Sequence, residues 1–262
     1  MTLEGWQCGL GELLQRGASR KRRNANVESS LDRLDLTADE RRSLLSLSDA
    51  PGFALTCHIT RWWRELRIRT GARLTCVQLS SSNRDHVLDY IDSNPFRSFF
   101  FFVEAVSFLD YVLAQAGVHA TVRAVARFEK TLLLAHDARE SNGVSEAPVA
   151  HCLAEDVQLV RNADASLVAL DRPAEILLAM LLKGQPATPK ERRGAYPVLV
   201  SPRLAHLWRP ASRAEARLFR QTRAPVLFAR ALRQSRSTRE AANSLIADGI
   251  LKRARQPDPV HH

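Results

Sequence analysis

The order of predicted elements near the C-terminus constrains the fold most strongly. Residues 196–200 have the composition of a strand, and residues 204–208 are expected to continue the sheet. Three short helices follow, and their predicted first residues are Ser212, Pro225 and Ser237. Gly249 ends the third helix, and residues 250–251 are expected to return as a wing strand. Strands, three compact helices with a tight turn at residues 235–236, and a wing are typical of a winged helix-turn-helix.

The segment before these elements has its own strand and helix signals. Residues 157–160 and 166–170 are short β-type runs, and the turn composition of residues 162–164 predicts that they form a hairpin. A helix is expected over residues 173–183, with Pro at its first position and Gly just past its end. This helix and the polar loop over residues 185–194 interrupt the predicted sheet.

The N-terminal half of the chain is predicted to be helical. Thr37 and Glu40 have the spacing of a capping box, in which the hydroxyl and the carboxylate each accept a free main-chain N–H. Further helices are expected over residues 82–94, 99–116 and 120–135. Residues 53–79 are ambiguous, because their first part has one apolar helical face, whereas residues 74–79 favour a short strand or an extended link.

These signals predict an α+β protein with a mainly helical N-terminal domain followed by a winged-helix domain. Residues 1–30 are polar, Arg-rich and without periodicity, so we expect a flexible basic tail. The polar segment 137–150 has the composition of a domain boundary. The helical domain is therefore placed at residues 31–148 and the winged-helix domain at residues 149–256.

Targeting signals and cysteine usage predict a cytoplasmic protein. No apolar segment follows the basic cluster at residues 20–23, which excludes a secretory signal. The apolar run over residues 99–118 contains Glu104 and Asp110, which a membrane span of about 20 residues would not carry. The four cysteines form no Cys-x-x-Cys pair and are expected to be free thiols.

The net charge is concentrated at one end of the chain. The whole chain has 38 Lys and Arg against 28 Asp and Glu, which leaves +10. The last 62 residues hold thirteen of these bases and only four of the acids. Most bases are Arg, whose planar guanidinium forms paired hydrogen bonds with carboxylates and phosphates. The C-terminal module is therefore predicted to bind an acidic partner.

No catalytic constellation is recognisable in the sequence. The eight histidines form no His-x-x-His or His-Glu-x-x-His pair, and no nucleophile elbow or phosphate-binding loop is present. His136 and Asp137 are similar to the dyad of His-Asp phosphohydrolases, but the flanking ligands are not recognisable. We expect a chain without catalytic activity, metal or cofactor, and an independent hydrolase is the weakest hypothesis.

Two aromatic groups stand out in the helical domain. Adjacent residues on a helix point about 100° apart, so at least one member of each group should lie off the core face. The groups either fill the core or form an exposed edge that docks another protein. The candidate partner-interface residues are Trp62, Trp63, Phe99 and Phe100.

Two functions compete for the basic C-terminal module. As a DNA reader, its last helix would turn Arg239, Asn243 and Ser244 toward base edges, although Glu240 and Asp248 would face phosphates. As a peptide clamp, a sheet edge would accept an extended segment as an added strand, and the last helix would wall the groove. The expected edge is residues 196–200 or their continuation through Trp208. The candidate peptide-binding residues are Tyr196, Val198, Leu199, Val200, Trp208, Arg236, Arg239, Ala242, Asn243 and Ile246.

Several blocks of the sequence together resemble a known family. They are Pro51–Thr56 with Arg61–Arg64, Ser98–Phe100 with Glu104–Ala105 and Phe108–Asp110, Arg127–Lys130 with Leu133–Leu134, and Val198–Pro202 with Leu207–Ser212 and Glu215–Ala216. Over about residues 30 to 255 the chain resembles the partner proteins of multinuclear non-heme iron-dependent oxidases, which act in pathways for ribosomally made peptide natural products (RiPPs).

The resemblance implies a division of labour between two proteins. The helical domain would dock an oxidase of the TIM-barrel type, and the C-terminal domain would be a RiPP recognition element that holds the leader of an acidic precursor peptide. The iron would belong to the oxidase, so no cofactor is expected in this chain. The hypothesis is thus a non-catalytic subunit of a heterodimer; the alternative is a winged-helix DNA-binding transcriptional regulator.

Overall fold

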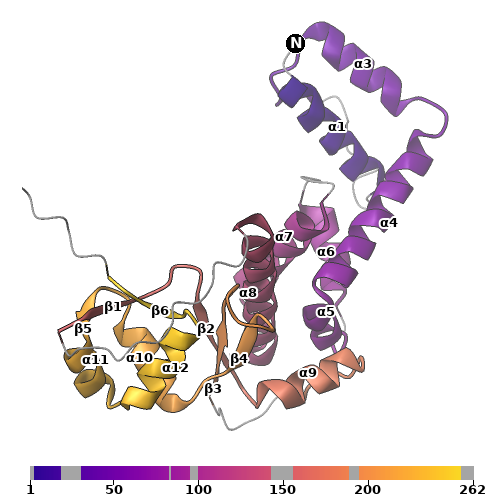
Figure 1. The fold of residues 1–262 in the computed structure, drawn as a ribbon. Helices are drawn as coiled ribbons and strands as arrows, with labels where there is room; N and C mark the ends of the chain where they lie inside the picture. The colour runs from indigo at the N-terminus through magenta and orange to yellow at the C-terminus, as the bar shows by residue number, and fades with distance from the viewer. Residues whose placement is uncertain are drawn as a thin grey trace, which may run out of the picture. The chain divides into compact units, whose positions relative to one another are not determined.

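The computed structural model describes residues 3–18, 31–82, 84–94, 100–142, 156–188 and 195–254 (Figure 1). Within these residues the chain forms eleven helices and two three-stranded antiparallel sheets, so the predicted α+β class is confirmed. The chain divides into two compact units, unit 1 at Met1–Val118 and unit 2 at His119–His262. This division lies earlier in the chain than the predicted boundary between residues 148 and 149.

The regular elements among the described residues of unit 1 are all helices. Its elements are α1 (Leu3–Ala18), α3 (Ala38–Ser48), α4 (Phe53–Gly71), α5 (Arg73–Leu79), α6 (His86–Ser93) and α7 (Phe101–Ala114). The long helix α4 packs against α1, α6 and α7 and so joins the unit together. The open question over residues 74–79 is settled in favour of a helix, since α5 covers them.

The N-terminal segment differs from the expected flexible tail. Helix α1 spans all the described residues of this segment, and Leu13 packs with Leu31 and Leu44 in a buried apolar cluster. The predicted capping box of α3 is confirmed, because the Thr37 hydroxyl accepts from the Glu40 N–H at 3.3 Å and the Glu40 carboxylate accepts from the Thr37 N–H at 2.8 Å.

A buried ion pair joins α4 to α7 inside unit 1. The side chains of Arg64 and Glu104 are 3% and 1% exposed. Arg64 Nε donates to Glu104 Oε1 at 2.9 Å, and its Nη1 donates to the carbonyl of Asn94 at 3.2 Å. The guanidinium also lies 5.8 Å from the centre of the Tyr90 ring. The charges are compensated by each other and by the surrounding main chain.

Unit 2 combines the long helix α8 with six strands and four shorter helices. Its elements are α8 (Ala120–Asn142), β1 (Gln158–Arg161), β2 (Ser166–Leu170), α9 (Ala174–Leu182), β3 (Tyr196–Val200), β4 (Trp208–Pro210), α10 (Arg213–Gln221), β5 (Val226–Leu227), α11 (Phe228–Ser235), α12 (Arg239–Ala247) and β6 (Leu251–Arg253). One sheet has the order β5-β1-β6 and the other the order β2-β3-β4, and all neighbours are antiparallel.

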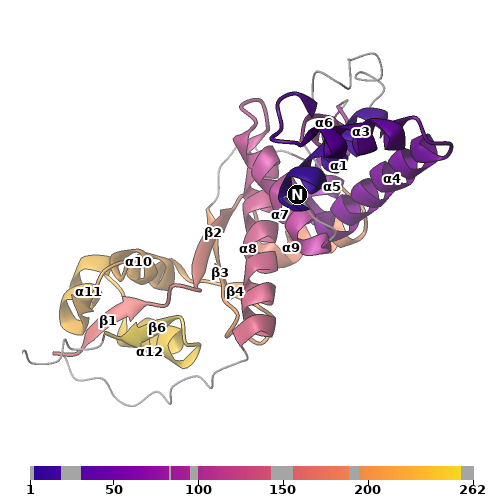
Figure 2. The ribbon, with the colours of Figure 1, turned by 90° about the horizontal axis from the view of Figure 1, so that it is seen from above.

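Helix α8 belongs to unit 2 because it is fixed to the second sheet. It packs against β2 and β3. The ring of Phe128 on α8 meets the ring of Trp208 edge to face, with centroids 5.9 Å apart. Near its end, Arg139 donates to the carbonyls of Pro202, at 2.7 Å, and Leu204. Figure 2 shows β2, β3 and β4 lying along α8.

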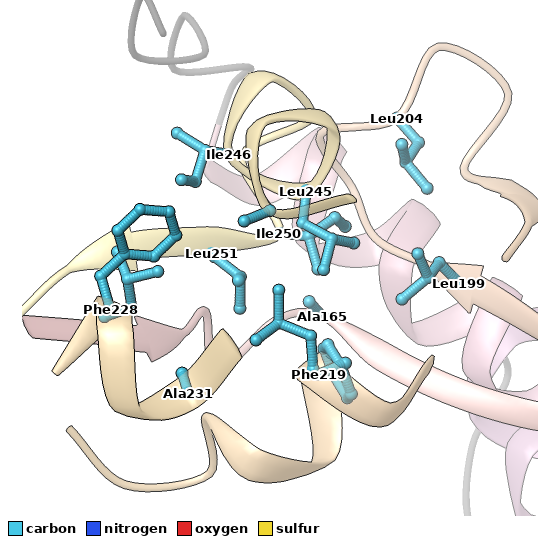
Figure 3. Close-up of a cluster of buried hydrophobic side chains, with 13 residues drawn as sticks. Ala165, Leu199, Leu204, Phe219, Phe228, Ala231, Leu245, Ile246, Ile250 and Leu251 are labelled. Atoms are coloured by element: carbon cyan, nitrogen blue, oxygen red, sulfur yellow. The ribbon is translucent and has the colours of Figure 1, made fainter. Parts of the chain in front are cut away.

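The opposite face of the second sheet joins the main core of unit 2. Val200 pairs with Trp208, and both lie on the α8 face of the sheet. Leu199 is the neighbour of Val200 in the strand, so its side chain points to the opposite face, away from α8. It enters a buried cluster with residues from β1, α10, α11, α12 and β6, including Phe219 and Phe228 (Figure 3). The β2-β3-β4 sheet is thus covered by α8 on one face and by the segment that contains α10, α11 and α12 on the other.

The predicted hairpin of residues 157–160 and 166–170 is wrong. The two runs do form strands, but β1 pairs with β5 and β6, whereas β2 pairs with β3. At the turn, the Asn162 N–H donates to the carbonyl of Ile250 at 2.8 Å, and its side-chain amide donates to the carbonyl of Gly249. These bonds direct the chain from one sheet into the other.

Element boundaries near the C-terminus differ in detail from the predictions. The capping box of Ser212 and Glu215 is confirmed, with the Ser212 N–H donating to the Glu215 carboxylate at 2.7 Å. The cap of α12 is Thr238 rather than Ser237, whose hydroxyl donates instead to the carbonyl of Ala214 at 2.7 Å. The expected continuation of the sheet at residues 204–208 begins only at Trp208.

Replacing Gly249 with alanine should lower the free energy of unfolding by about 2 kcal/mol, because Gly249 has φ +65° and an added Cβ would lie 2.7 Å from Arg203 Cδ. Gly184→Ala is the matched control, since Gly184 has φ +75° but no atom within 4 Å of the added Cβ. Urea denaturation should show a smaller loss for Gly184→Ala, and equal losses would contradict the close contact.

Candidate functional site

The predicted free edge at residues 196–200 is wrong. These residues form β3, which is the middle strand of its sheet and pairs with β2 on one side and with β4 on the other. Its main chain has no side left for an added strand. The edges of this sheet are β2 and β4, and the second of these includes Trp208, the end of the predicted continuation.

Strand β4 is a poor edge for pairing with another chain. It has only three residues, and Pro210 has no N–H to donate. Arg209 is held by Glu215 and Asp248, with its Nη2 at 2.7 Å and 2.6 Å from their carboxylate oxygens. Burial opposes ionisation of Glu215, but hydrogen bonds from Arg209 and the Ser212 N–H outweigh this effect and lower the pKa of the carboxyl group.

Strand β2 is an edge whose main chain is available. The Ser201 N–H donates to the Leu207 carbonyl, and the Ala211 N–H donates to the Pro197 carbonyl, so odd-numbered residues of β3 face β4. Even-numbered residues of β3 therefore face β2. By the register of the pair, Leu167 and Ala169 turn their N–H and C=O groups away from β3. No partner for these groups occurs in the part of the chain that the structure describes.

A basic cavity of about 660 Å³ lies beside this edge. Residues of β2 line it together with residues of α8, which covers one face of the sheet, and of α10, which covers the other. The cavity therefore passes around the edge of β2. Its lining residues are Arg127, Thr131, Arg161, Ala163, Ala165, Ser166, Leu167, Val168, Phe219 and Arg223.

Three arginines give this cavity its charge. Arg127 comes from α8, Arg161 from the end of β1, and Arg223 from the segment after α10. The Arg161 guanidinium stacks 5.3 Å from the centre of the Phe219 ring, which fixes its position on the α10 side. None of the three forms an ion pair with a described acidic residue. The three guanidinium groups can therefore bind carboxylates or other anions.

A smaller cavity of about 270 Å³ in unit 1 has a different character. Its arginines are already paired: Arg69 lies 3.0 Å from an Asp85 oxygen, and Arg84 is bound by Asp89. His86 also lines it, and burial together with the nearby charge of Arg84 lowers the pKa of its imidazole. Since its arginines are already neutralised, this cavity should bind an anion more weakly than the cavity beside β2, which we term the β2 cavity.

The predicted peptide-binding residues do not gather at one place. Five of them are buried in the core and turn no side chain to solvent: Val198, Leu199, Val200, Ala242 and Ile246. Trp208 is half-buried against Phe128. The exposed members are Tyr196 at the start of β3 and Arg236, Arg239 and Asn243 around the start of α12. The apolar character of these five side chains suggested a surface for a ligand. In the structure, the same apolar character serves packing in the core.

The residues of the β2 cavity were missed as a group. Arg223 belongs to the basic C-terminal set, but Arg127 lies in a predicted helix and Arg161 in a predicted hairpin. Only the pairing of strands brings them together. The sequence signal that could have found them is an arginine close to a buried apolar residue. Arg127 directly precedes Phe128, and Arg161 lies two residues after Leu159.

The candidate partner-interface residues lie on an exposed apolar surface of unit 1. Trp62 is 56% exposed and Phe100 is 74% exposed, while Phe99 lies outside the described residues. Trp62 and Trp63 contact each other edge to face, with ring centroids 4.9 Å apart. The exposed apolar residues of α4 share one helical stripe, which we term the α4 stripe: Leu55, Ile59, Trp62, Trp63 and Leu66. The opposite side of α4 buries Cys57, Arg64 and Ile68.

The described residues form neither a recognisable metal site nor a membrane-spanning helix. These contain no group of three or more His, Cys, Asp and Glu side chains placed to hold a metal ion. Within the same ranges, every helix is too short or too polar to cross a bilayer. Neither models of known protein families nor curated proteins gave a match to the sequence.

Proposed function

We propose that the protein is a non-catalytic recognition subunit that binds the leader of an acidic precursor peptide and presents it to an iron-dependent oxidase. The observation that carries this proposal is the available edge of β2 beside the cavity of Arg127, Arg161 and Arg223. An extended peptide would pair with the outward N–H and C=O groups of Leu167 and Ala169. The arginines would meet its acidic side chains.

The order of elements in the C-terminal segment supports the same proposal. In a winged helix, a short strand lies between the first two helices and a strand follows the third. Along the chain, strand β5 lies between α10 and α11, and β6 follows α12 (Figure 1). Strand β1, which precedes them in the chain, takes the middle position of the sheet. We interpret this segment as a winged-helix module completed by β1, in the manner of a recognition element.

The α4 stripe supports docking of a protein partner. Aromatic residues are the usual anchors of protein interfaces, and the stripe presents two tryptophans with three aliphatic neighbours. The proposed partner is the multinuclear non-heme iron-dependent oxidase, of TIM-barrel type, that would modify the peptide. The iron chemistry would take place in the oxidase, in the cytoplasm.

The first test is binding of the peptide to the sheet edge. Ala169→Pro should weaken binding of the adjacently encoded precursor peptide at least about tenfold, because proline removes the outward N–H and places its ring at the edge. Ala169→Thr is the matched control, since it keeps the N–H at the same exposed position. Isothermal titration calorimetry measures both. Equal affinities for the two variants would contradict strand addition at β2.

The second test concerns the oxidase. The double variant Trp62→Ser with Trp63→Ser should weaken association with the adjacently encoded oxidase at least about tenfold, because each tryptophan is an expected anchor. Its urea midpoint should hardly change, since both side chains are exposed. Ile176→Ser, a change at a 55% exposed position of α9, is the control. Co-purification that survives the double variant would overturn docking at the stripe.

The second candidate function is a DNA-binding regulator. It is favoured by the exposed Arg239 and Asn243 on α12, which directly follow the turn at Arg236. It is opposed by Glu240 on the exposed side of the same helix. Duplex binding would weaken steeply with salt, with a log–log slope of about −0.9 per phosphate contact. A mobility shift with this slope, together with no peptide binding, would favour the regulator.

A further inference from the structure

The three arginines of the β2 cavity lie on two walls, and the walls impose a pattern on what binds between them. Arg127 belongs to α8, on the face of the sheet that carries Trp208. Arg161 and Arg223 lie with Phe219, on the face that carries Leu199. The strand β2 runs between the two walls.

An added strand would place its side chains alternately toward the two walls. Successive residues of a strand point to opposite faces of the sheet, whereas residues i and i+2 point to the same face. Two acidic residues separated by one residue would therefore compete for one wall and leave the other unpaired. Two adjacent acidic residues would place one carboxylate on Arg127 and the other on the Arg161 and Arg223 side.

We propose that the β2 cavity selects an extended peptide with two adjacent acidic residues, one for each wall of arginines. This inference rests on the proposed function and specifies the ligand of the same site. Ser166 also lines the cavity; it pairs with Val200, which pairs with Trp208, so its hydroxyl lies on the α8 face and offers a neutral hydrogen-bond donor to the carboxylate on the Arg127 wall.

The test uses labelled decapeptides with the same composition and the full-length protein. One has the sequence Thr-Val-Thr-Val-Glu-Asp-Val-Thr-Val-Thr, and its isomer has Thr-Val-Thr-Glu-Val-Asp-Val-Thr-Val-Thr. Fluorescence anisotropy should show about tenfold tighter binding of the first peptide, the value for one charge-assisted hydrogen bond. A third peptide, with Gln and Asn in place of Glu and Asp, should bind more weakly than both.

Variants of the two walls test the assignment of each carboxylate. Arg127→Ser should reduce the benefit of one acidic residue about fivefold or more, and Arg223→Ser should reduce the benefit of the other. Peptides with a single amide replacement, Gln-Asp or Glu-Asn, identify which acid each variant affects. Arg220→Ser, an exposed change on α10 outside the cavity lining, is the charge-matched control and should affect neither.

The outcomes separate this inference from the proposed function. If the isomers bind equally, or if both wall variants affect the same acid, the two-wall pattern is overturned. Should Ala169→Pro still weaken binding of the precursor in that case, the proposed function stands without the pattern. If no decapeptide binds while the precursor does, the pattern is also overturned. If neither the decapeptides nor the precursor binds, both proposals fail.

Discussion

Replacing Glu104 with alanine should lower the free energy of unfolding of unit 1 by about 3 to 5 kcal/mol, the usual cost of removing one partner from a buried ion pair. The change would leave the Arg64 guanidinium, only 3% exposed, without its carboxylate. The carbonyl of Asn94, 3.2 Å from Arg64 Nη1, compensates part of the charge. Because the pair joins α4 to α7, its loss should also loosen the contact between these helices.

Urea denaturation of the full chain measures this effect, with Trp208→Phe as the background. The remaining tryptophans, Trp6, Trp62 and Trp63, then all belong to unit 1. The double variant Arg64→Met with Glu104→Leu is the control, since replacing a buried pair by apolar residues is often neutral or stabilising. A loss below about 1 kcal/mol in Glu104→Ala would show that the pair is not desolvated in solution.

Arg209→Ala should cost about 2 to 3 kcal/mol of unfolding free energy in unit 2, because it removes charge-assisted hydrogen bonds to two carboxylates. Arg209 Nη2 lies 2.7 Å from Glu215 and 2.6 Å from Asp248, and it thereby connects β4 to α10 and α12. This expected loss is smaller than the loss for a fully buried pair, since the Arg209 side chain remains 26% exposed.

The loss of unfolding free energy in Arg209→Ala should become smaller as the pH falls. In the folded protein the pKa of Glu215 is lowered, because hydrogen bonds from Arg209 and Ser212 outweigh the opposing effect of burial. Its contribution to stability is therefore present above its unfolded pKa and is lost as the pH falls through the folded value. The difference between the original chain and Arg209→Ala should shrink in acid, as Glu215 becomes protonated. A difference that is constant from neutral to acidic pH would contradict the assignment.

A second control separates the charge of Arg209 from its packing. Glu215→Gln in the Arg209→Ala background should recover part of the loss at neutral pH, because the buried carboxylate that was left unpaired becomes neutral. The Ser212 N–H would still find an oxygen acceptor in the glutamine side chain. No recovery would indicate that lost packing dominates the cost.

Local features of the fold were predictable because the interactions that form them span a few residues. The capping boxes at Thr37 and Ser212 need only a hydroxyl and a carboxylate three residues apart. The same applies to the end of α12 at Gly249, whose φ of +65° favours glycine. These signals gave the α+β class and most of the helices.

Strand pairing could not be predicted in the same way. The composition of residues 157–170 is equally compatible with a hairpin and with two strands in different sheets. What decides is burial: Leu159 and Leu199 enter one core, which they reach from β1 and β3 of separate sheets. The position of the free edge follows from that pairing, and so does the convergence of Arg127, Arg161 and Arg223. The basic charge was predictable, whereas its location at β2 was not.

The insertion of β1 as the middle strand between β5 and β6 determines how this module can be divided and assembled. The three C-terminal helices are contiguous, yet their sheet depends on a strand that precedes β2, α9, β3 and β4 in the chain. A fragment that begins after β4 would lack this strand, and β5 and β6 would have nothing between them. Closure over so long a segment is a non-local step, which slows folding. The three C-terminal helices therefore cannot form their sheet as an isolated fragment, and they must fold together with the preceding segment that contains β1 and the β2 edge.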